Sequence, residues 1–267
     1  SAFPEGSYTV TVSASDLAGN SNAGTTSLTF QIDTTSPTLV LEQSDEDGIV
    51  KNSNTVVVTA TFSEAMQATP TLNMGSLITN QAMTATASSA VWIHSINIGS
   101  LSAADGSYQV TVTGSDLVGN NYSGTDSLTL TIDNTAPTLL SREDSDSDNI
   151  LYANDTVVVT ATFSEAMTAT PTFKSAITNW AMSQTSSPAV WTTTLDVNAY
   201  PFVDGTSYPF VFNGSDLAGN GYNNATSSVT FVMDFTPPTV VLTDSDADNF
   251  VSSADTVKVT ATFSEGM

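Results

Sequence analysis

The sequence predicts an all-β protein made of tandem sandwich repeats with a period of about 100 residues. Two observations carry this prediction. The same short strings recur about every 100 residues, and within each copy apolar and polar residues alternate along the chain. Alternation with a period of two is typical of half-buried β-strands, and no stretch keeps the 3.6-residue period of an amphipathic helix.

Three strings define the repeat and its boundaries. They are Asp-Leu-x-Gly-Asn at 16–20, 116–120 and 216–220, Asp-x-Thr-x-Pro-Thr at 33–38, 133–138 and 234–239, and Thr-Ala-Thr-Phe-Ser-Glu at 59–64, 160–165 and 260–265. The chain therefore divides into four segments. They are the end of one repeat at 1–35, two complete repeats at 36–135 and 136–236, and the start of a further repeat at 237–267.

The expected strands can be followed in order through the copy at 136–236. One begins at Pro137, and the later ones cover Thr156–Phe163, Val190–Val197, Tyr208–Phe212 and Ser228–Met233. In the preceding copy, residues 55–62 are apolar at every even position and Thr at three of the four odd ones, which favours a strand. About seven short strands per 100 residues, separated by Gly-containing turns, is typical of an immunoglobulin-like sandwich.

Aromatic residues at fixed places in the repeat support this fold. Tyr8, Tyr108 and Tyr208 each follow a Gly-containing turn, where immunoglobulin-like domains carry a tyrosine corner. We expect Trp92 and Trp191 to fill the core between the two sheets.

The charge balance excludes one class of partner. The chain has 27 Asp and Glu against 4 Lys and Arg, for a formal charge of −23. Nucleic acid is excluded as a partner, since phosphate binding needs clustered Lys and Arg. The uncharged stretch 65–104 is interrupted by Ser, Thr, Asn and Pro throughout, so the segment is not expected to span a membrane. The first six residues lack a secretion signal, and we expect the chain to be part of a longer one.

No catalytic constellation is found in the sequence. The chain has no Cys, which removes disulfides, thiolate zinc sites and cysteine nucleophiles. Its single His, His94, has no recurrent partner and is expected to be an ordinary strand residue. A paired-carboxylate glycosidase is the one catalytic option, but acids that recur in every copy at strand connections indicate an architectural role. We therefore predict that the chain is not an enzyme.

The acids predict calcium binding. Most of them fall in connections between strands, and the immunoglobulin-like topology gathers acids from both sides at each junction between copies. Like charges about 4 Å apart repel by roughly 1 kcal/mol even in water, and a hard divalent ion would offset this. Ca²⁺ takes six to eight oxygen ligands, which this chain offers in abundance.

The strongest motif is an acidic loop that resembles a calcium loop in its spacing. Its candidate ligands are Asp144, Asp146, Asp148, the carbonyl of Ile150, and Asp155, repeated as Asp244, Asp246, Asp248 and Asp255. Asn149 and Asn249 stand where such loops have Gly, which Asn tolerates because it visits the left-handed region. The alternative interpretation is a solvated acidic turn.

Other acids are weaker candidates. The first copy keeps Asp45 and Asp47 but has Gln43 and Asn54 in place of two Asp, so we expect weaker binding there. Further candidate ligands are the acids at the exits of the two complete copies, Asp133 and Asp234, and those of the Asp-Leu-x-Gly-Asn strings, Asp116 and Asp216. For the latter pair a tight turn, in which Asp caps backbone amides, is an equal alternative.

Together, the Asp-Gly-x-Tyr, Asp-x-x-Gly-Asn and Asp-Thr-Thr-x-Pro-Thr strings and the segment Val-Thr-Ala-Thr-Phe-Ser-Glu-Ala-Met resemble the bacterial immunoglobulin-like repeats of very large secreted surface adhesins. The resemblance implies an extracellular, cell-surface stalk that acts as a spacer, with neighbouring repeats as partners and calcium near the junctions. It carries Asp116, Asn120, Asp133 and Pro137 over as motif residues.

Two alternatives to the spacer stay open. One is a glycan- or surface-binding module that uses the uncharged flank at 70–100, for which Trp180 is the candidate exposed aromatic residue. The other is a surface-lattice protein.

Overall fold

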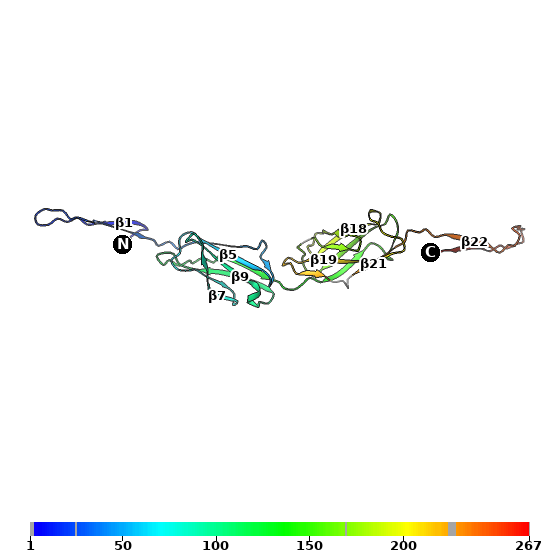
Figure 1. Ribbon diagram of the computed structural model, residues 1–267, viewed down its shortest axis with the longest axis horizontal. Coiled ribbons are helices and arrows are strands. Elements are labelled where there is room, and N and C mark those ends of the chain that lie inside the picture. The colour runs from blue at the N-terminus through cyan, green and yellow to red at the C-terminus, as the bar shows by residue number, and fades with distance from the viewer. Residues whose placement is uncertain (1–2, 25, 169, 224–227, 267) are drawn as a thin grey trace. The chain divides into compact units, whose positions relative to one another are not determined.

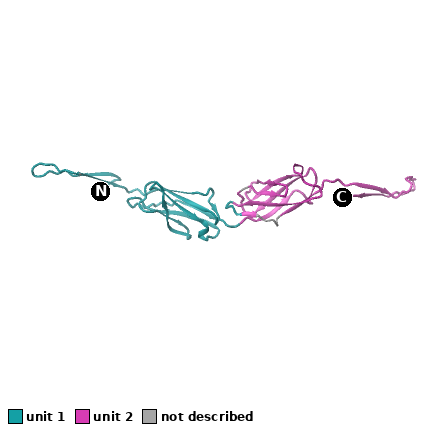
Figure 2. Ribbon diagram, in the orientation of Figure 1, with its two compact units in different colours: residues 1–135, 217–220 teal, residues 136–216, 221–267 magenta. Residues whose placement is uncertain are grey.

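The computed structural model describes residues 3–24, 26–168, 170–223 and 228–266. The chain divides into two compact units, residues 1–135 with 217–220 and residues 136–216 with 221–267 (Figure 2). Both are built from β-strands, as predicted. Within the described residues, no helix is long and apolar enough to span a bilayer.

The first unit contains a hairpin and a two-sheet sandwich (Figure 1). In the sandwich, one sheet has the order β3-β5-β9-β8 and the other the order β4-β11-β10-β6-β7. The strands are β1 (Gly6–Thr11), β2 (Ser27–Ile32), β3 (Leu39–Gln43), β4 (Ile49–Val50), β5 (Thr55–Phe62), β6 (Thr71–Met74), β7 (Ile78–Ala82), β8 (Thr84–Ala85), β9 (Val91–Asn97), β10 (Gly106–Thr113) and β11 (Ser127–Ile132). A short 3-10 helix, η1 (Ile98–Leu101), follows β9.

The second unit repeats this plan with a sandwich and a C-terminal hairpin. Its sheets have the orders β12-β14-β18-β17 and β13-β21-β19-β15-β16, with β20 beside β19. The strands are β12 (Leu139–Asp144), β13 (Ile150–Leu151), β14 (Thr156–Phe163), β15 (Thr172–Lys174), β16 (Asn179–Ala181), β17 (Ser183–Gln184), β18 (Val190–Asp196), β19 (Ser207–Ser215), β20 (Gly221–Asn223), β21 (Val229–Met233), β22 (Val240–Asp244) and β23 (Val259–Phe263). The helix η2 (Val197–Ala199) follows β18.

Strand pairing repeats with the sequence. Gly6 pairs with Ile32 in the first hairpin, and Gly106 pairs with Ile132 one period later. In each complete copy the second strand lies parallel to the last one, β4 beside β11 and β13 beside β21, while the other pairs are antiparallel. The hairpin β1–β2 is therefore the counterpart of β10–β11.

The cores lie where the alternation predicts. In β5, the even positions from Val56 to Phe62 are buried, and the Thr positions between them lie on the outer face. His94 lies within β9, as expected. Trp191 is buried and Trp92 is partly buried against its core cluster. Tyr108 forms the expected corner by donating from its hydroxyl to Ala104 O at 2.9 Å.

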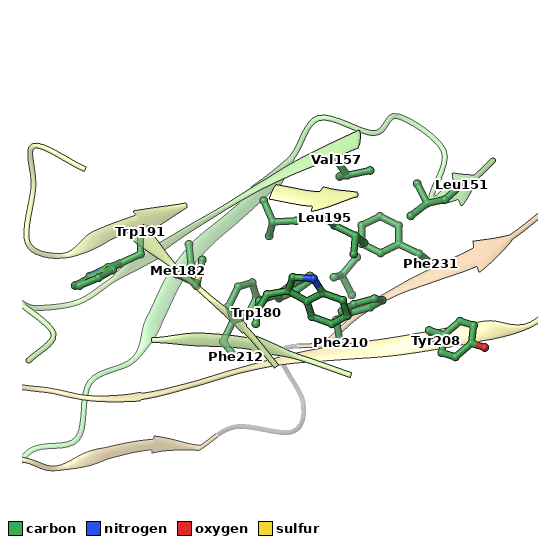
Figure 3. Close-up of a cluster of buried hydrophobic side chains, with 14 of the residues drawn as sticks. Leu151, Val157, Trp180, Met182, Trp191, Leu195, Tyr208, Phe210, Phe212 and Phe231 are labelled. Carbon is green, nitrogen blue, oxygen red and sulfur yellow. The ribbon is translucent and has the colours of Figure 1, made fainter. Parts of the chain in front are cut away.

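Trp180 corrects one expectation. It is not an exposed platform, because its side chain is only 6% exposed and lies in the aromatic core of the second unit (Figure 3). Trp180 faces Phe173 across the β15–β16 pair, and its ring meets that of Tyr200 edge-on at 4.8 Å. The sequence pattern missed this because β16 is a three-residue strand, too short for alternation to show which side faces inward.

Candidate metal centre

Three carboxylates from distant parts of the sequence meet in the first unit. Asp33 follows β2, Glu64 follows β5, and Asp116 lies in the turn after β10. One carboxylate oxygen of each lies within 4.8 Å of the other two. Asp116 is only 1% exposed, and the other two are half-buried. The expectation that a junction gathers acids from both sides is therefore met in this unit.

The Asp-Leu-Val-Gly-Asn segment forms a tight turn around Asp116. Asp116 Oδ1 accepts hydrogen bonds from the backbone amides of Val118 at 3.0 Å, Gly119 at 2.8 Å and Asn120 at 2.8 Å. Gly119 has a φ of +97°, a conformation that glycine adopts at little cost. The capped turn, one of the two alternatives for this motif, is thus present. The second carboxylate oxygen of Asp116, Oδ2, takes no part in capping these amides.

Asn120 connects this turn to the linker before the sandwich. Its Nδ2 donates to Asp116 Oδ2 at 2.8 Å, and it also lies 3.3 Å from Asp33 O and 3.2 Å from Thr35 O. One period later, Asn220 Nδ2 donates to Asp133 O at 2.9 Å, again across 87 residues. The Asn of the motif therefore holds the exit of the preceding copy in both cases.

The ionised form of Glu64 is disfavoured within this cluster. Burial raises the pKa of Glu64, and the charges of Asp33 and Asp116 raise it further. Burial also pushes the pKa of Asp116 up, but the hydrogen bonds from Asn120 and the turn amides hold it below its usual range. Lys51 is the only Lys or Arg in residues 1–135, and its ammonium donates to Gly219 O. An all-oxygen cluster of this kind fits a hard divalent cation such as Ca²⁺.

The acidic loop of the second copy is arranged differently. Asp146, Asp148 and Asp155 line one small hollow together with Ser145 and Ser147. Each of the three Asp caps a nearby amide, and Asp148 Oδ1, for example, accepts from Ile150 N at 3.0 Å. Among the described residues, none of these loop acids belongs to a trio with ligand oxygens within 4.8 Å of one another. Asp144 does not line the hollow, and calcium ligation by this loop stays a prediction.

The backbone of Ile150 was a further candidate ligand. Ile150 begins β13, which pairs in parallel with β21. The carbonyls on either side of it, Asn149 O and Leu151 O, accept from Val232 N and Asp234 N at 2.9 Å each. Because carbonyls alternate in direction along a strand, Ile150 O points away from this ladder.

The last acidic position of the loop can be compared between the three copies, which shows whether its turn needs a carboxylate. Asn54, Asp155 and Asp255 each accept a hydrogen bond from the amide three residues earlier. Since Asn54 makes this bond without a charge, the turn itself does not require a carboxylate at the other two positions. In the same loops Asn149 and Asn249 have φ values of +61° and +64°, as expected.

The remaining loop candidates also act as caps. Asp45 and Asp47 accept from Gly48 N at 3.0 Å and Ile49 N at 2.9 Å. Burial and the neighbouring Asp47 raise the pKa of Asp45. Asp244 accepts from Asp246 N at 2.9 Å and Asp248 from Phe250 N at 3.0 Å.

Two classes of residue were missed by the sequence-based ligand set. Glu64 recurs as Glu165 and Glu265 at the end of the Thr-Ala-Thr-Phe-Ser-Glu string. This recurrence was the signal that could have identified Glu64 as a candidate ligand. Asp105 clamps the exit linker by accepting from Asn134 N at 2.9 Å and Thr135 Oγ1 at 2.6 Å. These bonds hold the pKa of Asp105 below its usual range. The Asp-Gly pair and the linker Thr both recur in the next copy, and this recurrence could have indicated the contact.

The three acids of the cluster have counterparts one period later in the sequence. The counterparts of Asp33, Glu64 and Asp116 are Asp133, Glu165 and Asp216, and Asp216 is likewise 1% exposed. Asp133 Oδ1 and Asp234 Oδ1 each accept from the amide of the linker Thr two residues later, at 3.0 and 3.2 Å.

Part of the chain matches a known family, and most of the chain is similar to solved structures. Residues 1–86 match the family model described as bacterial Ig-like domain (group 3). The chain is similar to a solved region of a 1.5-MDa bacterial ice-binding adhesin, with 21% identity over 87% of this chain and 76% of that one, and a TM-score of 0.42. It is also similar to a fragment of the titin I-band, with 11% identity over 86% and 77% of the two chains, and a TM-score of 0.40. No curated protein matches the chain.

Proposed function

We propose that this chain is a non-enzymatic spacer segment of a large bacterial surface adhesin, located outside the cell and stiffened by Ca²⁺ at its linkers. The match of residues 1–86 to a bacterial Ig-like family supports the spacer role. The observation that carries the calcium part is the cluster of Asp33, Glu64 and Asp116.

The residues of the cluster come from the two elements that a stiff linker must join. Asp33 lies in the linker that leaves the first hairpin, while Glu64 and Asp116 belong to loops of the sandwich that follows. A bound Ca²⁺ would supply charge neutralisation and oxygen coordination to all three carboxylates. The side-chain amide of Asn120 bonds both Asp116 and the linker carbonyl of Thr35, which supports a site that joins the linker to the sandwich.

The acidic loops would add further sites. Asp146, Asp148 and Asp155 already line one hollow, and the loop at 244–255 repeats their residue types. At millimolar calcium and a Kd of about 10⁻⁴–10⁻³ M, each site adds on the order of 1 kcal/mol to the free energy of unfolding. Several such sites along the chain would stabilise and stiffen the array together.

Calorimetric titration of the whole chain tests this proposal. After treatment with chelator, the chain should bind several Ca²⁺ ions, and its melting temperature should rise with calcium and fall again with chelator. Mg²⁺ serves as the control ion, and it should bind far more weakly because it demands tight octahedral geometry. Equal melting temperatures in calcium and in chelator would show that the acids are solvated turns, leaving a spacer that needs no metal.

A further inference from the structure

The two sheets of the first sandwich leave a hollow between them at one edge. It lies between β7, the edge strand of one sheet, and the second half of β9 in the other sheet. The short strand β8 pairs with β9 only at Trp92 and Ile93, so residues 94–97 have no strand partner on that side within the described residues. The hollow has a volume of about 330 Å³, a size typical of the smaller small-molecule sites. The side chains that line it include Leu77, Ile78, Gln81, His94, Ile96 and Leu101.

The imidazole of His94 faces this hollow. His94 pairs with Val58, which is buried in the core. Because directly paired residues point to the same side of a sheet, His94 points between the two sheets. In the part of the chain that the structure describes, its side chain has no hydrogen-bond partner, whereas its counterpart Thr193 donates from Oγ1 to Ala181 O at 3.1 Å. The imidazole can therefore bond to a molecule that enters the hollow.

In the second copy, an aromatic side chain occupies the equivalent place (Figure 3). Gln81 pairs with Leu72 on β6. One copy later, Trp180 pairs with Phe173 at the same place on β15. Gln81 is exposed, whereas Trp180 is buried. The first copy therefore has a short polar side chain where the second copy has a buried indole ring.

Two further rings of this aromatic group are missing from the first copy. Counted from the ends of β9 and β18, Leu101 and Ala103 stand where the second copy has Tyr200 and Phe202. In the second copy, the Trp180 ring meets Tyr200 edge-on at 4.8 Å and lies parallel to Phe202 at 6.4 Å. Leu101 lines the hollow of the first copy, as does the residue that replaces Trp180. The hollow thus lies where the second copy packs its own aromatic rings.

We propose that this hollow, which we call the His94 hollow, binds a small neutral aromatic compound of the indole class. Leu77, Ile78 and Ile96 give it an apolar floor against which a flat ring can pack. A neutral imidazole has one acceptor nitrogen, so His94 matches the N–H group of such a ring. Among the described residues, none that lines the hollow is acidic, although the chain has a net charge of −23. The ligand therefore meets apolar and neutral polar groups rather than carboxylates.

A titration of the full chain with indole, followed by NMR, tests this proposal. His94 is the only His of the chain, so its ring resonances are unambiguous, and indole should shift them until the site is saturated. Gln81→Trp gives the first copy the residue that the second copy has at this place. This variant should bind indole at least about tenfold more weakly, because its own ring fills the hollow. The matched control is Gln109→Trp, at an exposed position of β10, and it should bind like the wild type.

The same variants give a second readout without any ligand. Gln81→Trp should melt at a higher temperature than the wild type, since the added ring buries apolar surface, and Gln109→Trp should not. Leu101→Tyr, the other replacement taken from the second copy, should also weaken indole binding. Cyclohexanol is the control ligand, because it is apolar and of similar size but has no aromatic ring.

Three results would overturn the proposal. They are the absence of saturable shifts with indole, equal indole affinity of Gln81→Trp and the wild type, and equal affinity of the wild type for indole and cyclohexanol. The titrations should agree in calcium and in chelator, because the described residues that line the hollow include no carboxylate. The calcium part of the proposed function can therefore fail without affecting this result.

Discussion

Asn120 Nδ2 donates to Asp116 Oδ2 at 2.8 Å, and the same nitrogen lies 3.2 Å from Thr35 O. One amide thus fixes both the most buried acid of the candidate metal centre and the linker that enters the sandwich. Asn20 makes the equivalent bond to Asp16 Oδ2 at 2.8 Å in the first hairpin.

Replacing Asn120 by Ala should loosen this connection. We expect the chain to lose on the order of 1 kcal/mol of unfolding free energy for the lost hydrogen bonds, and to bind calcium more weakly at this centre. Chemical denaturation and calorimetry measure the two effects. Asn121→Ala, at the exposed neighbouring position, is the control, and an identical result for both variants would contradict the role of Asn120.

Replacing Glu64 by Gln should have opposite effects with and without calcium. In chelator the variant should melt at a higher temperature, because the raised pKa of Glu64 shows that its charge is unfavourable in the folded state. In calcium it should gain less stability than the wild type, since a ligand is lost. Glu42→Gln, on the outer side of β3, is the control. A variant that melts lower than the wild type in chelator would refute the interpretation of the cluster as repulsive.

Replacing both Asp146 and Asp148 by Asn should weaken calcium binding with little change of stability in chelator. The Asn side-chain oxygens can still cap the amides of Asn149 and Ile150, so the turn is preserved. The same pair of changes at Asp45 and Asp47 should matter less, because Gln43 and Asn54 already replace two of the four carboxylates at the candidate ligand positions of that loop. If calorimetry finds that the changes at Asp45 and Asp47 weaken calcium binding more than those at Asp146 and Asp148, the result would count against a calcium loop in the second copy.

Acid should loosen the linker clamps. Hydrogen bonds lower the pKa values of Asp105 and Asp204 in the folded chain. Their contribution to stability is therefore present above the ordinary Asp pKa of about 3.9 and is lost as the pH falls through the lowered values. In chelator, the melting temperature should drop over this range, and the drop should shrink in Asp105→Asn. An unchanged pH profile in that variant would show that the clamp contributes nothing.

Trp180 should be a major contributor to the stability of the second unit. Replacement by Ala should cost about 3–5 kcal/mol of unfolding free energy, as is usual for a buried aromatic residue. Replacement by Phe should cost less, because Trp180 Nε1 has no hydrogen-bond partner among the described residues. Tyr152→Ala, at a position 54% exposed, is the control. Denaturant unfolding followed by fluorescence distinguishes these cases.

The period of the sequence and the alternation within it were sufficient to predict the fold. Residues 55–62 and 156–163 form β5 and β14 as expected, because long β-branched strands with one buried face have a strong pattern. The place of Trp180 could not be predicted, since short edge strands such as β16 carry too few residues to show a period.

The candidate site was predictable only in part. Asp116 belongs to a recurrent string, so its importance could be inferred from the sequence. Its proximity to Glu64 and Asp33 depends on how β5, β10 and the linker are packed, and no local pattern encodes that packing. Conversely, the spacing of the acidic loop at 144–155 predicts a compact ligand set, whereas in the structure each Asp caps its own turn.

The parallel pairing of β4 with β11 and of β13 with β21 has a mechanical consequence. In each sandwich the segment near the N-terminal entry is hydrogen-bonded to the segment before the C-terminal exit, for example through Thr131 N to Gly48 O and Asp133 N to Val50 O, both at 2.8 Å. Tension applied to the two ends of the chain pulls these parallel strands past each other along their length. The bonds of the pair are then loaded in shear and must break together, which resists extension more strongly than the one-by-one opening of a hairpin.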